Sequence, residues 1–223
     1  RHRMRFLGKE YKMKRFSFSV FCMGLVFAAS GAVFGYPDFD ACTVQMPNIG
    51  DATPVIFVLP AEGGTPLSEA RNLGTCEVVD ATIEVMLVDH LGQPMHYTLP
   101  EELSLGSPGG SFETCGWGAF PDYGPDENGI AYWISNIGAY GRNEGELDVL
   151  LNYTPISGQY PQLNIWVNSA DMNGDGTVNI VDVSNFSEHY FGTYDFSADY
   201  FPDGVLNLAD VVLLALGLGQ SCP

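Results

Sequence analysis

Twelve residues near the C-terminus, 171–182, constrain the fold of this chain more than any other feature. Oxygen-bearing side chains stand at positions 1, 3, 5, 9 and 12 of this segment, which are Asp171, Asn173, Asp175, Asn179 and Asp182. Gly176 stands at position 6, where a tight loop needs a positive φ. Ca²⁺ takes about six to eight hard oxygen ligands, and alternate loop residues can supply them, with the Thr177 carbonyl as a further one. The alternative is a solvated Asp/Asn turn that caps a helix. Such a turn does not require oxygen-bearing residues at all five of these positions, so we expect a calcium site here.

The same pattern recurs in a second segment, residues 199–210. Side-chain oxygens stand at positions 1, 5, 9 and 12, glycine at 6 and a carbonyl ligand at 7, which are Asp199, Asp203, Asn207, Asp210, Gly204 and Val205. Position 3 is Phe201, which has no side-chain oxygen. We therefore expect the second loop to bind Ca²⁺ more weakly than the first, or not at all.

Each loop is followed by apolar residues at helical spacing. They are Val183, Phe186 and Tyr190 after the first loop, and Val211, Val212, Leu214, Ala215 and Leu218 after the second. Both loops end in aspartate at position 12, where an ordinary EF-hand has a bidentate glutamate. Two such loop–helix units without an entering helix resemble a type I dockerin, and the resemblance covers about a quarter of the chain, from residue 169 onward.

The resemblance implies a calcium-bound helical module that docks on a cohesin domain. Partner choice in dockerins is associated with loop positions 10 and 11, which here are Ile180 with Val181 and Leu208 with Ala209. These pairs are apolar, whereas many dockerins carry hydroxyl pairs there. We therefore expect either a cohesin of unfamiliar specificity, or packing against another part of this chain or another copy of it.

The N-terminal region has the pattern of an export signal. Lys14 and Arg15 precede an apolar run, residues 16–29, that ends in small residues. This predicts a signal peptide that starts at Met13 and is cleaved between Ala32 and Tyr36. The run is short for a membrane span and is interrupted by serine, so we expect no anchor. The predicted location is extracellular or at the cell surface.

Acidic residues dominate the charge, and the whole chain has a formal net charge of −18. Seven of the nine basic residues and one of the 27 acidic residues precede residue 16, so the remainder carries a net charge of −24. Such a field repels nucleic acid and anionic membranes and concentrates divalent cations. It also keeps an exported protein soluble without any partner.

Four cysteines follow the predicted leader, an even number that suggests two disulfides in an exported chain. Cys42, Cys76, Cys115 and Cys222 allow three pairings. We favour Cys42 with Cys115 and Cys76 with Cys222. None of the four forms a C-x-x-C pair, which argues against a zinc site.

Between the leader and the calcium loops, short β-rich runs alternate with turn clusters. The expected strands are residues 55–59, 81–88, 131–134, 147–151 and 163–167. This spacing predicts an antiparallel β-sandwich. Residues 82–94 and 126–133 together resemble a bacterial immunoglobulin-like domain. The predicted organisation is a leader at 1–35, an immunoglobulin-like sandwich at 36–167, and a dockerin-like calcium-binding module at 168–223.

No combination of residues predicts an active site. His90, His96 and His189 fall in separate predicted elements. Adjacent Glu101 and Glu102 would point to opposite faces of an extended strand, which does not suit a glycosidase pair. Serine-hydrolase elbows, phosphate loops and dinucleotide fingerprints are missing. We therefore predict that the protein is not an enzyme.

A non-catalytic, acidic sandwich with a calcium module suits a building unit. We predict a secreted calcium-binding structural protein, a self-associating subunit of an extracellular filament or surface assembly. One alternative is an adaptor that binds a cohesin-bearing scaffold. Another is a carbohydrate-binding module that uses Trp117, while Trp133 and Trp166 are expected in the core.

Overall fold

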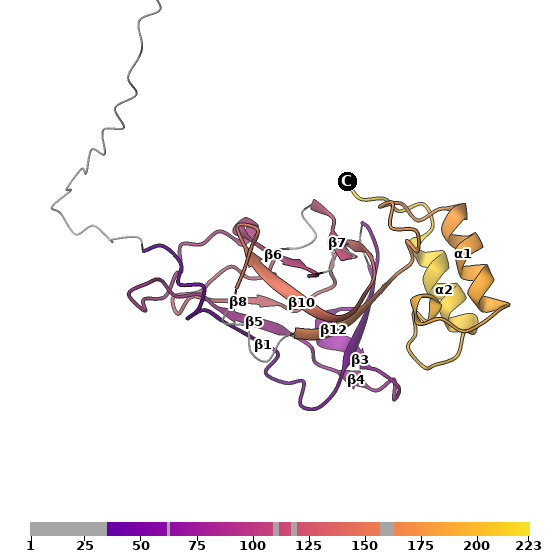
Figure 1. Cartoon of the computed structure of the whole chain (residues 1–223), viewed down its shortest axis with the longest axis horizontal. Helices are drawn as coiled ribbons and strands as arrows, with labels where there is room; N and C mark the ends of the chain where they lie inside the picture. The colour runs from indigo at the N-terminus through magenta and orange to yellow at the C-terminus, as the bar shows by residue number, and fades with distance from the viewer. Residues whose placement is uncertain (1–34, 62, 109–111, 117–119, 157–162) are drawn as a thin grey trace, which may run out of the picture. The chain divides into compact units, whose positions relative to one another are not determined.

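The computed structural model describes residues 35–61, 63–108, 112–116, 120–156 and 163–223 (Figure 1). The predicted signal peptide and Trp117 lie outside the described residues. Residues 35–223 form one compact unit. In the part of the chain that the structure describes, no helix is long and apolar enough to cross a membrane.

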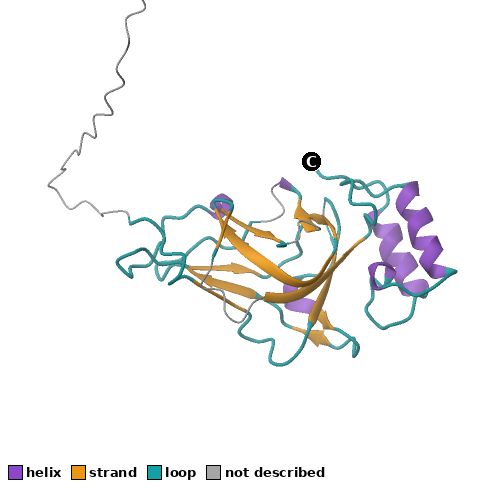
Figure 2. Ribbon diagram, in the orientation of Figure 1, coloured by secondary structure: helices purple, strands orange, loops and turns teal. Residues whose placement is uncertain are grey.

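The described chain is mainly β, with two helices near the C-terminus (Figure 2). The strands are β1 (Thr43–Gln45), β2 (Pro54–Val58), β3 (Ala70–Asn72), β4 (Val78–Val79), β5 (Ile83–Met86), β6 (Leu103–Gly106), β7 (Phe112–Thr114), β8 (Ile130–Trp133), β9 (Ala139–Gly141), β10 (Asn143–Leu151), β11 (Thr154–Pro155) and β12 (Leu163–Ser169). The helices are α1 (Ile180–Tyr190) and α2 (Leu208–Gly217), with short 3₁₀ turns at Leu67–Glu69, Pro100–Glu102 and Phe196–Ala198.

These strands form two main sheets. The smaller has the order β1-β5-β8, and the larger has the order β11-β10-β12-β2-β3-β4 with β6 also paired to β10. A further pair joins β7 to β9. Every pairing between these strands is antiparallel except β12 with β2, where Val167 lies opposite Ile56. A parallel pair needs a long connection, and most of the sandwich lies between these two strands in the sequence.

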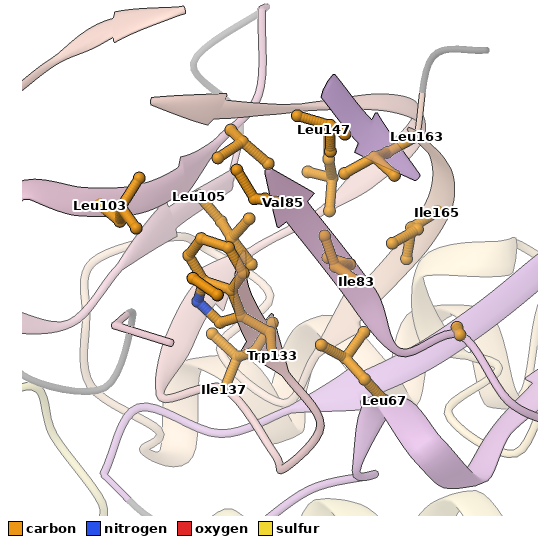
Figure 3. Close-up of a cluster of buried hydrophobic side chains, with 14 of the residues drawn as sticks. Leu67, Ile83, Val85, Leu103, Leu105, Trp133, Ile137, Leu147, Leu163 and Ile165 are labelled. Atoms are coloured by element: carbon orange, nitrogen blue, oxygen red, sulfur yellow. The ribbon is translucent and has the colours of Figure 1, made fainter. Parts of the chain in front are cut away.

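One core joins the two sheets, which confirms the predicted β-sandwich. Alternate residues of β5 and β8 are buried, as expected for strands with one solvated face. Figure 3 shows side chains of both sheets turned toward one another, among them Ile83, Val85, Trp133, Leu103, Leu105, Leu147, Leu163 and Ile165. Burying each such side chain contributes about 1.5–3 kcal/mol of transfer free energy.

All five predicted strands occur, with shifted ends. The largest shift is in β10, which begins at Asn143 rather than near residue 147. The shorter strands β1, β3, β4, β6, β7, β9 and β11 were not predicted. They have two to four residues each, too few to show a period of two.

Strand β2 is buried on both faces. One face packs in the sandwich core and the other packs against the C-terminal helices. Ile56 and Val58 belong to the core between the sheets. Phe57 and Leu59 belong to a second cluster, completed by Ala170, Val178, Phe186, Ala198, Tyr200 and Leu214. The helices thus cover the other face of β2. The predicted boundary near residue 168 stays a prediction.

The disulfide differs from the pairing that we favoured. Cys115 is bonded to Cys222, with a Cα–Cα distance of 5.2 Å, and Cys42 and Cys76 are free. Cys42 is buried beside β1, where its Sγ contacts the backbone of Val88. Cys76 lies in the turn between β3 and β4. The pairs Cys42–Cys115 and Cys76–Cys222 are therefore wrong, because the fold brings the C-terminal segment to β7 instead.

Candidate metal centre

The first predicted calcium loop winds around the carboxylate of Asp171. Its Oδ1 accepts hydrogen bonds from the backbone N–H groups of Gly174 at 2.9 Å and Asp175 at 3.2 Å. Its Oδ2 accepts from Gly176 N–H at 2.6 Å. Gly176 has a φ of 79°, a conformation that a side chain would disfavour. The buried position-1 carboxylate therefore organises the first half of the loop.

The position-12 carboxylate closes the loop from the first turn of α1. Asp182 Oδ1 accepts from Asn173 N–H at 3.2 Å, and Oδ2 accepts from Asn179 N–H at 2.8 Å. The Asn179 side chain in turn accepts from Val181 N–H at 2.8 Å. This reciprocal arrangement is a capping box, which explains why α1 begins at residue 180.

The remaining predicted ligands of this loop bond to one another. Asp175 Oδ1 accepts from Thr177 N–H at 2.9 Å, and Oδ2 accepts from Asn173 Nδ2 at 2.9 Å. Asn179 Nδ2 donates to the Thr177 carbonyl at 3.2 Å. The six predicted residues therefore lie in one hydrogen-bonded loop.

The second loop repeats these bonds at the same positions. Asp210 Oδ1 accepts from Phe201 N–H and Oδ2 from Asn207 N–H, both at 2.9 Å. Asp199 Oδ2 accepts from Gly204 N–H at 2.9 Å. The internal repeat is therefore structural as well as sequential. The predicted side-chain ligand Asp203 accepts from Val205 N–H at 2.9 Å, and the Val205 carbonyl accepts from the Asn207 side chain at 3.1 Å.

Two features distinguish the second loop from the first. Phe201 stands at the position that lacks a side-chain oxygen. The Cζ atom of Arg71 lies over the Phe201 ring, 4.5 Å from the ring centre. Asp199 is buried, and its Oδ2 also accepts from the Tyr194 hydroxyl at 2.7 Å. Its Oδ1 has no hydrogen-bond partner among the described residues. A buried carboxylate oxygen without a partner costs about 1–3 kcal/mol or more, and a cation would supply that partner.

The electrostatics of both loops disfavour the charged carboxylates. Burial raises the pKa of Asp171, Asp199 and Asp210, and the hydrogen bonds from loop N–H groups only partly offset it. Neighbouring carboxylates raise these pKa values further: Asp182 acts on Asp171, Asp210 and Asp203 act on Asp199, and Asp203 acts on Asp210. A bound cation would remove both penalties.

The described residues contain no group of three or more His, Cys, Asp or Glu side chains placed to hold a metal ion. The loop carboxylates instead accept hydrogen bonds from their own backbone, as described above. Calcium binding therefore stays a prediction. Hard oxygen donors, the repeated loop geometry and the unpartnered oxygen of Asp199 fit such an ion.

Other candidate residues lie apart from the loops. His90 stacks on Tyr36, His96 contacts Tyr97, and His189 lies on α1. Glu101 and Glu102 lie in a 3₁₀ turn, so the expected extended strand was wrong there, and both line a pocket of about 440 Å³. The chain turns there because Glu102 accepts a hydrogen bond from Leu99 N–H at 2.9 Å.

Sequence reasoning missed two residues that attach the loops to the sandwich. Tyr200 is buried between Phe57 and Phe186, with ring centres 5.1 and 5.6 Å away. Asn168 of β12 is buried, and its Nδ2 donates to the carbonyls of Phe196 at 2.7 Å and Asp199 at 2.9 Å. The sequence signal for Asn168 was a polar residue at the end of an apolar strand pattern, just before a calcium-type loop.

Comparisons with known proteins leave the chain unassigned. No family model matches it, and no curated protein matches it. A similar solved structure is described as the Lin-41 filamin domain, at 22% identity and a TM-score of 0.29, covering 59% of this chain and 95% of that one. A likeness at that score carries no argument, so the sandwich assignment rests on the two sheets and their shared core. The immunoglobulin-like and dockerin-like assignments stay predictions.

Proposed function

We propose that this protein is a non-catalytic, secreted, calcium-binding structural subunit whose copies associate through an apolar face of the C-terminal helices. The supporting observation is a set of exposed apolar side chains next to the two loops. We call Ile180, Val181, Leu208, Val212 and Leu216 the helical face. Ile180 is 76% exposed, Leu208 70% and Leu216 63%.

Helix α2 gives the strongest support to this proposal, because it is apolar on its buried side and on its exposed side. Leu214 and Gly217 pack inward, while Leu208, Val212 and Leu216 recur every four residues on the exposed side. The one charged residue of α2, Asp210, is buried in the loop. A helix that is apolar all round is normally covered, and contiguous exposed apolar surface marks an interaction site.

The charge of the chain favours a second copy at this face over contact through charged surfaces. After the predicted leader only two basic residues remain, Arg71 and Arg142. Both are engaged, Arg71 with Phe201 and Arg142 with Asp195 at 3.7 Å. Two copies would repel through their carboxylates, whereas the helical face has no charge. The repeat also places Ile180 and Leu208 at equivalent loop positions, a pattern that suits a self-complementary contact.

Calcium would act in this proposal as a folding cofactor of the helical face. The ligand sets are those of the two loops, and their buried carboxylates are Asp171, Asp182, Asp199 and Asp210. Without the ion, like charges crowd each loop. With it, binding free energy adds to stability and both helices begin from a rigid loop.

Electron microscopy and analytical ultracentrifugation of the purified protein, in calcium and in chelator, test the proposal. We expect filaments or sheets in calcium and dispersed protein in chelator. Leu216→Asp should abolish assembly while leaving the fold intact, because Leu216 is exposed. Leu99→Asp is the matched control, an equally exposed leucine outside the helices at 61%. A monomer in both conditions would refute self-association. Assembly that survives Leu216→Asp would refute the helical face as the contact between copies.

The adaptor alternative makes use of the same helical face. Positions 10 and 11 of both loops are exposed or half-buried, so a cohesin-type domain could contact them. This alternative predicts a monomer that binds a cohesin domain in calcium and loses that binding in Leu216→Asp. The sugar-binding alternative stays a prediction, because its candidate Trp117 lies outside the described residues.

A further inference from the structure

The outer face of the smaller sheet has a pocket that the assembly proposal does not use. It has a volume of about 650 Å³ and is lined by β8, by Asp80 and Thr82 just before β5, and by neighbouring loops. That volume falls within the range of about 300–1,000 Å³ found for small-molecule sites. None of the helical-face residues lines it.

Two tyrosines form the aromatic part of this pocket. Tyr123 pairs with Tyr132 of β8 in an isolated antiparallel bridge, with Tyr132 N–H donating to the Tyr123 carbonyl at 3.2 Å. Residues directly opposite in an antiparallel pair project their side chains from the same face. Trp133, the next residue, points into the core. Both tyrosines therefore project outward, and Tyr123 is 65% exposed.

The polar part of the pocket is held in place by its own hydrogen bonds. Asp80 accepts from Asn48 Nδ2 at 2.7 Å and from Thr82 N–H at 3.0 Å. Asp126 Oδ1 accepts from the N–H groups of Asn128 at 2.8 Å and Ile130 at 3.0 Å. Both carboxylates are thus oriented before any ligand arrives, and exposed acceptor capacity remains on each.

The chemistry of these groups narrows the ligand. Two carboxylates, on a chain of net charge −18, repel an anion. A purely apolar ligand would leave the remaining acceptor capacity of the two carboxylates unused. A cation cage encloses its guest with aromatic faces, whereas this pocket is open to solvent. A neutral polyol with apolar ring faces and many hydroxyl donors satisfies both parts of the pocket.

We propose that the pocket between Tyr123, Tyr132, Asp80 and Asp126 binds a segment of a neutral polysaccharide. Sugar ring faces pack on the tyrosines, and sugar hydroxyls donate to the two carboxylates. The Asn48 amide and the Thr82 hydroxyl lie at the same pocket and bond to further hydroxyls. This site is independent of the helical face, so either proposal can fail without the other.

Retention of the purified protein on insoluble polysaccharides tests the proposal. The probes are cellulose, xylan, mannan and starch, with polygalacturonate as an anionic and chitosan as a cationic comparison. We expect retention on at least one neutral polymer, unchanged by salt because no net charge is exchanged. Affinity should fall about three- to tenfold in Tyr123→Ala, the size expected for one aromatic contact.

Two further variants separate this site from other exposed aromatics. Asp126→Asn keeps an acceptor for Asn128 and Ile130, so weaker retention in this variant reports on the carboxylate itself. Tyr153→Ala removes a tyrosine that is 92% exposed on a different pocket and should leave retention unchanged. No retention on any neutral polymer, or equal loss in Tyr153→Ala, would overturn the proposal. So would binding to chitosan alone that disappears in high salt, which would assign a cationic ligand.

Discussion

Asn168 is the residue at which a single side chain ties the sandwich to the second loop. It is the second-last residue of β12 and is fully buried, and its amide donates to the carbonyls of Phe196 and of Asp199, where the loop begins. Its own Oδ1 has no partner among the described residues, so the amide donors account for its position. A buried polar residue of this kind costs desolvation and is retained for the geometry that it imposes.

We predict that Asn168→Ala destabilises the protein by about 2 kcal/mol, because one buried and one half-buried carbonyl lose their donor. Chemical denaturation, followed in chelator to remove any effect of metal, measures the change. Asn164→Ala is the matched control, an asparagine on the same strand with an exposed side chain, and it should change stability by less than about 0.5 kcal/mol. Equal effects of the two variants would show that the two hydrogen bonds of the Asn168 amide do not stabilise the protein.

At the scale of elements, the C-terminal segment acts as an extra strand on the first loop. Cys222 N–H donates to the Gly176 carbonyl, and Val178 N–H donates to the Gln220 carbonyl, each at 2.9 Å. Thr177 forms an isolated bridge with Ser221. The Cys115–Cys222 disulfide then fastens this segment to the sandwich across 107 residues of sequence.

We predict that Cys222→Ser lowers stability by about 2–4 kcal/mol, because a long chain loop is released in the unfolded state. Thermal unfolding should also show a smaller calcium-induced stabilisation, since the released segment no longer holds residues 176–178. Cys76→Ser is the control, because Cys76 is a free cysteine and its removal breaks no crosslink. If calcium stabilised wild type and Cys222→Ser equally, the disulfide would have no influence on the first calcium loop.

At the scale of the whole molecule, the second apolar cluster packs the two loops and their helices against the sandwich. Tyr200 of the second loop packs on Phe57 of β2 and on Phe186 of α1. Gly217 lets α2 approach closely, because a Cβ there would lie 2.7 Å from Leu59 Cδ2. The order of the loops and the packing of the sandwich are therefore linked through β2.

We predict that calcium at about 100 times its dissociation constant stabilises the protein by about 2.7 kcal/mol. Calorimetry in calcium and in chelator measures this shift. Asp175→Ala should remove most of the shift while leaving the sandwich folded, as read by far-ultraviolet circular dichroism. Asp51→Ala, an exposed carboxylate outside the loops, is the control. Identical melting in calcium and chelator would argue against calcium as a cofactor.

The sequence alone determined the features that depend on neighbours along the chain. The two loops and the start of each helix follow from side chains that bond within about ten residues, such as Asp182 with Asn173. The longer strands follow from alternation of apolar residues, which reports one buried face. Strand β2 shows no such alternation, because all five of its residues are buried, and no local pattern identifies what covers its second face.

The tertiary structure decided the features that join distant residues. These are the Cys115–Cys222 bond, the parallel pairing of β2 with β12, the cluster around Tyr200 and the bridge that sets Tyr123 beside Tyr132. No local pattern specifies such contacts, because each depends on how two separate elements pack in three dimensions. Four cysteines allow three pairings by sequence, and only the chain path brings Cys222 to Cys115 and leaves Cys42 buried and free.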